Sequence, residues 1–209
     1  MTDAFLQFIF DQLREKRCEI APGLSDGEVG VIERKYDLRF PPDLHRFLQM
    51  GLPVLGLPGD GRDYGEAEVI STGSWVDWRN DSEEEIRERL DLPADGICFD
   101  IEYNNFWRDD WGRRPSNLQD AFGVARESIA AAPKLIPIFG HRYIPEEPSE
   151  VGNPVFSVIQ TDIIYYGYDL TGYLLNELNH TYLSVDFPDL LPDYVAKSPR
   201  SIRFWDYFV

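Results

Sequence analysis

The residues best suited to chemistry or binding lie in one segment, DIEYNNFWRDDWGRRP, at 100–115. Tryptophan and arginine are enriched at binding hot spots, because they bury much area and still form hydrogen bonds. We therefore predict partner contacts here and just upstream, at Trp78, Arg79, Trp107, Arg108, Trp111 and Arg113. The alternative is structural: Trp107 and Trp111 anchor a long loop on the core, and Arg113 pairs with Asp109 or Asp110.

Three consecutive carboxylates, Glu83, Glu84 and Glu85, lie between the predicted contacts at 78–79 and those at 107–113. Asp81 or Ser82 can cap a short helix that begins there, with Ile86 and Leu90 facing inward. Acidic side chains favour the first turn of a helix, so a solvated first turn explains the run. The alternative is that the run contacts a basic partner, and we include it among the predicted contacts.

A second group of residues could form a cleft. Apolar residues alternate over 96–102, which predicts a half-buried strand with Asp100 and Glu102 on one face. Two carboxylates on one face could serve acid–base chemistry or hold a cation. Together with Asn104, Trp107, His141 and Arg142 they would line a site for a small molecule or peptide. The alternatives are a solvated strand face and a structural hydrogen bond from the His141 ring to a backbone carbonyl.

Standard catalytic and metal-binding motifs do not occur in the sequence. The three histidines, His45, His141 and His180, are far apart, and no CxxC, GxSxG, HExxH or Walker pattern is found. We therefore expect no catalytic residues, no metal and no cofactor, and a binding protein in preference to an enzyme.

The charge of the chain limits its partners. The net charge is −17, and residues 61–130 contain 8 basic and 17 acidic side chains, a net of −9. Such a surface repels nucleic acid and anionic membranes and attracts basic proteins. The alternative is that the charge serves solubility. Two cysteines outside any motif, Cys18 and Cys98, and the lack of a signal peptide or membrane span predict a cytoplasmic protein.

The elements that must position these residues follow from the apolar spacing. We predict helices over 3–16 and 26–36 and a third that stops at Gly51, with a capping box at Ser25 and Glu28. A long helix opens at Pro115 and Ser116, and a last helix covers 169–179. Strands are expected over 135–139, 142–144, 155–159 and 163–166, the last two being separate or one bent strand. The order predicts a single α+β domain over 1–209, with a mostly antiparallel or mixed sheet covered by helices.

The N-terminal third resembles the SUKH superfamily, the Smi/Knr-like cell-wall regulators. The resemblance lies in Ser25-Asp26-x-Glu28, Ile32-Glu33, Tyr36-Asp37-Leu38, Phe40-Pro41-x-Asp43-Leu44 and Phe47-Leu48, and in a late strand and helix over 155–157 and 169–178. It implies an α+β fold and, in bacteria, an immunity protein that neutralises a toxin, often a nuclease. The resemblance brings no catalytic residues.

Three hypotheses follow. The first is a non-catalytic immunity or regulatory protein that binds another protein, such as a basic toxin. The second is a small-molecule or peptide-binding module, weakly hydrolytic, with the cleft described above. The third is a homo-oligomer that uses the aromatic tail Phe204-Trp205-Tyr207-Phe208, and we expect a monomer or weak homodimer.

Overall fold

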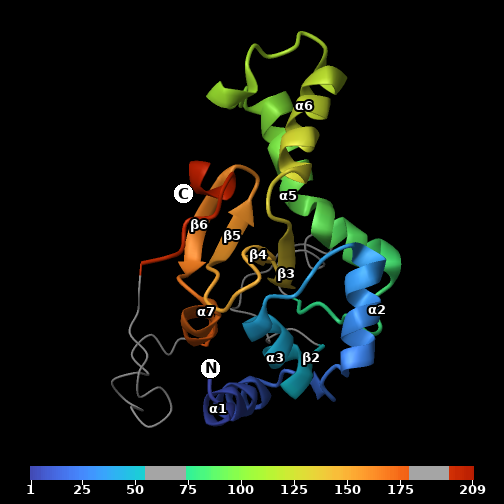
Figure 1. Cartoon of the computed structure of the whole chain (residues 1–209), viewed down its shortest axis with the longest axis vertical. Coiled ribbons are helices and arrows are strands. Elements are labelled where there is room, and N and C mark those ends of the chain that lie inside the picture. Colours follow the sequence, from blue (N-terminus) through green and yellow to red (C-terminus); the bar gives the residue numbers. More distant parts are fainter. Residues whose placement is uncertain (55–73, 179–197) are drawn as a thin grey trace.

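The structure is a computed structural model that describes residues 1–54, 74–178 and 198–209 (Figure 1). The glycines and prolines of 51–65 predict a loop, and Val69 and Ile70 predict a short strand. Most of the loop and both strand residues lie outside the described residues. The described chain has the α+β architecture that the sequence predicts, with helices packed on an antiparallel sheet.

The three N-terminal helices form as predicted. They are α1 (Asp3–Glu15), α2 (Asp26–Tyr36) and α3 (Pro42–Met50). The capping box is confirmed, because the Ser25 hydroxyl accepts the Glu28 N–H and the Glu28 carboxylate accepts the Ser25 N–H. Two short strands, β1 (Ile20–Ala21) after α1 and β2 (Leu52–Pro53) after α3, pair with each other in an antiparallel manner.

The main sheet has four antiparallel strands in chain order. They are β3 (Leu135–Phe139), β4 (Arg142–Pro145), β5 (Val155–Ile159) and β6 (Asp162–Gly167). The last two are separate strands that form a hairpin. Trp75 adds an isolated antiparallel bridge to Phe139, so the chain before α5 (Glu83–Tyr103) is tied to the β3 edge.

The strand side chains alternate between two cores. Ile144 and Val155 join a cluster with the N-terminal helices and α7 (Leu170–Glu177), whereas Tyr143 and Phe156 join a second cluster on the opposite face. The second cluster contains side chains of α5 and of α6 (Leu118–Ala130). The sheet therefore lies between two layers of helices.

Helix α5 (Glu83–Tyr103) corrects one prediction. It is a single helix of 21 residues, and the strand expected over 96–102 is its last two turns. Ile97 and Ile101 are fully buried while Phe99, between them, is 44% exposed, which is the four-residue spacing of a helix face. Pro93 lies inside the helix.

The second half of α5 pairs with α6 (Leu118–Ala130) and projects beyond the sheet in Figure 1. The segment between them contains a short 3-10 helix, η1 (Asp109–Trp111). The chain ends in a second one, η2 (Trp205–Tyr207), whose Trp205 is buried in the second core cluster. The aromatic tail therefore packs on its own chain.

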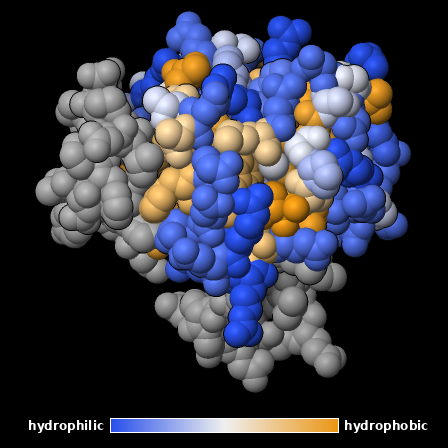
Figure 2. All heavy atoms as spheres, turned by 90° about the horizontal axis from the view of Figure 1, so that it is seen from below, coloured by the Kyte–Doolittle hydropathy of each residue, from blue (hydrophilic) through white to orange (hydrophobic). Residues whose placement is uncertain are grey.

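Figure 2 shows the end of the molecule opposite this projection. A ridge of hydrophilic side chains crosses the face, with apolar side chains on both sides, so the apolar surface there is interrupted. None of the helices in the described part of the chain is both long enough and apolar enough to cross a membrane.

Candidate protein-binding surface

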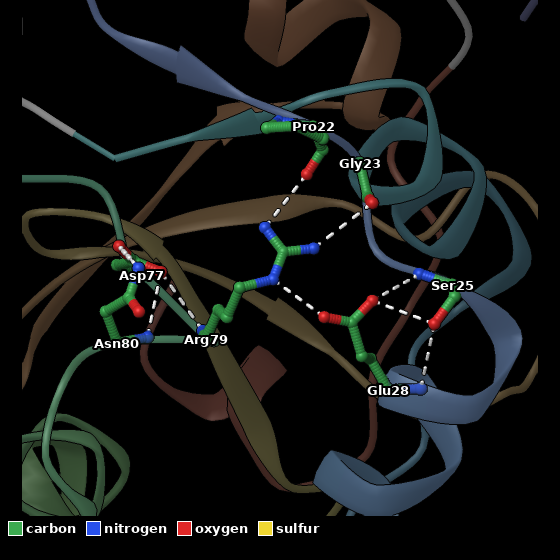
Figure 3. A network of polar contacts seen from close by, with 7 residues as sticks. All are labelled: Pro22, Gly23, Ser25, Glu28, Asp77, Arg79 and Asn80. Carbon is green, nitrogen blue, oxygen red and sulfur yellow. Dashed lines mark hydrogen bonds and ion pairs between the residues drawn. The ribbon is translucent and has the colours of Figure 1, made fainter.

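Arg79, one of the predicted contacts, is held by internal hydrogen bonds (Figure 3). Its Nε donates to Glu28 at 2.7 Å, and its two terminal nitrogens donate to the carbonyls of Pro22 and Gly23 at 3.0 and 3.2 Å. The Arg79 guanidinium and the Ser25 donors lower the pKa of Glu28 to about 2. This arginine therefore fastens the turn before α5 to the N-terminus of α2.

Trp78, the neighbouring predicted contact, lies in the first core. Its ring is 5% exposed and meets Phe40 edge-on, with ring centroids 5.2 Å apart. Asp77 stabilises the turn by accepting hydrogen bonds from the backbone of Arg79 and Asn80. Trp78 thus offers a partner little surface.

The three glutamates at the start of α5 are all exposed but differ in their contacts. Ser82, rather than Asp81, is the N-cap, and Glu85 completes its capping box. Glu83 pairs with Lys35 at 3.3 Å and with Arg87 at 2.8 Å. Glu84 has the most freedom to meet a partner.

Arg108 has an internal role as well. It is 7% exposed, and its Nε and Nη2 bind both oxygens of Asp110 at 2.8 and 2.7 Å. Its Nη1 donates to the Phe204 carbonyl at 3.0 Å, and its guanidinium lies 4.2 Å from the Tyr207 ring centroid. We call residues 103–115 the aromatic segment. Arg108 therefore joins the aromatic segment to the C-terminal residues.

The two tryptophans of this segment pack on each other and on the second core cluster. Trp107 and Trp111 meet edge-on at 5.1 Å, and the Trp107 indole N–H donates to the Gly112 carbonyl at 2.8 Å. Both are half-buried, which matches the anchoring alternative. Asp110 pairs with Arg108 and not with Arg113, whose side chain is exposed.

The expected cleft is divided by the fold. Because 96–102 is helical, Asp100 and Glu102 do not share a face: Asp100 is 4% exposed, and Glu102 is exposed. Asp100 accepts bonds from the Thr161 backbone at 2.9 Å and from Asn104 at 2.5 Å. It fastens α5 to the turn between β5 and β6.

Of the other two polar residues of the expected cleft, Arg142 contacts groups outside it, and His141 is half-buried. Arg142 lies over the Tyr166 ring, 3.7 Å from its centroid, and 3.6 Å from Glu177 of α7, on the face of the sheet opposite Asp100. Burial, and then the neighbouring Arg142, lower the pKa of His141 to about 4, so this imidazole is neutral at pH 7 and a weak base. Trp107 packs on the second core cluster, and the structure does not bring the six residues into one site.

The outer face of α5 is a surface that the sequence interpretation missed. The helix carries eight acidic side chains and two arginines, a net of −6, and all of the eight except Asp100 are exposed. Arg89 is buried, and its guanidinium donates to Ser74. The acidic side chains recur at helical spacing in Glu84, Glu88, Asp91 and Asp95, which line one shallow hollow. The spacing is present in the sequence. It was not recognised as one face because a short helix was predicted here, followed by a strand over 96–102.

A groove of about 840 Å³ borders this face and shares Arg87 and Asp91 with it. It lies between the C-terminal ends of α2 and α6, α5, and the loop after β4. Its charged side chains balance, with four basic and four acidic groups: Arg39, Arg87, Arg126, Lys134, Asp37, Asp91, Glu146 and Glu147. The groove therefore offers polar and apolar side chains beside α5, and its balanced charges do not offset the negative charge of the α5 face.

Within residues 1–54, 74–178 and 198–209, no three His, Cys, Asp or Glu side chains gather as a metal ion would require. Comparison of the chain with protein-family models, with curated proteins and with solved structures gives no match.

Proposed function

We propose that this protein is a non-catalytic binding protein whose partner is a basic protein, as expected of an immunity or regulatory protein of the SUKH type. The observation that carries the proposal is the outer face of α5, where seven acidic side chains are exposed on one helix. The chain as a whole has a net charge of −17, so the local field and the overall field have the same sign. A basic toxin fits this description.

The physical role of such a face is to accelerate encounter and orient the partner. Electrostatic steering raises association rates by about 10- to 1,000-fold at low salt and weakens as salt screens the charges. The long-range attraction comes from all seven carboxylates together. Glu84 and Glu88 form no ion pair within residues 1–54, 74–178 and 198–209, so their carboxylates are available for direct contact.

The test compares two variants that lose the same number of charges. One carries E84Q, E88Q, D91N and D95N on α5, and the control carries four exposed substitutions elsewhere, E15Q, E19Q, E127Q and D162N. Binding to the product of a neighbouring toxin-like gene is measured in a pull-down at low and raised salt. We expect the α5 variant to lose capture and the control to retain it. Absence of capture by the unmodified protein, or equal loss in both variants, contradicts the proposal.

A further inference from the structure

A row of exposed apolar side chains runs along α5 beside the acidic face. Leu92, Phe99 and Tyr103 are 39%, 44% and 65% exposed. Their spacings of seven and four residues place them on one side of the helix. The Phe99 and Tyr103 rings lie against each other with centroids 4.6 Å apart. Three large apolar groups in line on a solvent-facing helix are typical of an interaction surface.

Exposed acidic side chains flank this row on one side only. At about 100° per residue, Glu88 and Asp95 lie within roughly 60° of the row, and Glu102 lies about 80° from it. The other flank is formed by Arg89, Pro93 and Asp100, which are buried. The surface therefore has an apolar row and a negative flank, both parallel to the helix axis.

We infer that the apolar row and its acidic flank are the docking surface for a cationic amphipathic helix of the partner protein. The inference rests on the proposed function and specifies the form of the partner at the same surface. The row extends over 92–103, which is roughly 16 Å at about 1.5 Å per residue, or about three helical turns. A helix with apolar residues at i, i+3, i+4 and i+7 can pack on this row and place lysine or arginine over Glu88 and Glu102, while Asp95 pairs with Arg126 of α6 at 2.6 Å.

The nature of the surface favours a helix over an extended peptide. Strand addition needs the free backbone groups of a sheet edge, and α5 uses its backbone groups within the helix. The charge likewise selects among occupants. A second copy would bring another face of net −6 against the first, and nucleic acid or an anionic membrane would be repelled in the same way.

The experiment uses two labelled synthetic peptides of about 14 residues, composed of leucine and lysine and matched in composition. One has the leucines on a single helical face, and the other has them scrambled. Fluorescence anisotropy measures the affinity of each for the full chain and for the F99A/Y103A variant. A V31A variant is the control, because Val31 is an apolar residue of α2 that is 54% exposed. These side chains are at the surface, so the variants are expected to fold.

We expect the amphipathic peptide to bind about tenfold more tightly than the scrambled one, and F99A/Y103A to remove that difference. V31A should bind like the unmodified chain. Equal binding of the two peptides, or F99A/Y103A binding like V31A, overturns the inference but leaves the proposed function intact if the binding is still sensitive to salt. Failure to bind either peptide contradicts both. A dimer at micromolar concentration that F99A abolishes would replace the partner helix with a second copy.

Discussion

Arg108 provides the sharpest test of how the aromatic segment is built. Its side chain is 8% exposed and contacts both the segment itself and the C-terminal residues, so truncation to alanine removes three kinds of interaction. The hydrogen bond to the Phe204 carbonyl comes from a charged donor and contributes about 1.5–3 kcal/mol. Stacking on Tyr207 and its aromatic neighbours adds about 1 kcal/mol.

The pair with Asp110 adds less than about 1 kcal/mol, because the Asp110 side chain is 61% exposed and water screens the interaction. We therefore expect R108A to lower the free energy of unfolding by about 3–4 kcal/mol. Urea denaturation followed by tryptophan fluorescence measures this difference. A loss of less than about 1 kcal/mol refutes the proposed role of Arg108.

Arg113 is the matched control, because it lies in the same segment and its side chain is exposed. R113A should change the free energy of unfolding by less than about 0.5 kcal/mol. Equal effects of R108A and R113A would mean that the segment is held by its tryptophans alone. Since both arginines were predicted as partner contacts, binding measured on the two folded variants also shows whether either contributes to recognition.

Two further predictions concern stability. The pKa of Glu28 is lowered from 4.5 to about 2, first by Arg79, so the ionised carboxylate stabilises the fold above pH 4.5 and this contribution is lost as the pH falls toward 2. Chemical denaturation at pH 6 and near pH 2 should therefore show a stability gap between the unmodified chain and E28Q that closes at the lower pH, and a pH-independent gap contradicts the assignment. G96A should lower the free energy of unfolding, measured by thermal or urea denaturation, by about 1–3 kcal/mol. The reason is that its new Cβ would lie 2.8 Å from the backbone Cα of Gln160. G123A in α6, whose Cβ would meet nothing within 4 Å, should be neutral or stabilising by up to about 1 kcal/mol, and a similar loss in both variants would contradict the close-contact explanation.

The N-terminal helices could be predicted because their signals are local. In α1 the buried residues recur every three or four positions, and in α2 the capping box is complete within four residues. The strand over 135–139 could also be predicted, because it is a short apolar run, and the structure confirms it as β3.

The second half of α5 could not be assigned with the same ease. Ile97, Phe99 and Ile101 fit the two-residue period of a strand, while Ile97 and Ile101 alone fit a helix, and Pro93 and Gly96 both disfavour helix continuation. The structure resolves the ambiguity through distant contacts: α6 packs on α5, and Gly96 lies against the β5–β6 turn. The acidic face and its apolar row were missed with the helix, because they are continuous only when 83–103 is one element.

The pairing of the aromatic segment was beyond sequence reasoning for a similar reason. Arg108 and Arg113 have comparable neighbours along the chain, and Asp110 is near both. Arg108 is selected because Phe204 and Tyr207 return from almost 100 residues away to contact its guanidinium. The cleft residues were likewise separated by the sheet, whose two faces cannot be assigned from the residue types alone.

The outer face of α5 is the surface proposed to receive a basic partner. The most direct measurement is backbone amide chemical-shift mapping on the isotope-labelled full chain during titration with the basic partner, or with the cationic amphipathic peptide described above. We expect the largest changes on Glu88, Leu92, Asp95, Phe99 and Tyr103 along α5. Changes concentrated instead on 104–115, or along the groove away from α5, would contradict it.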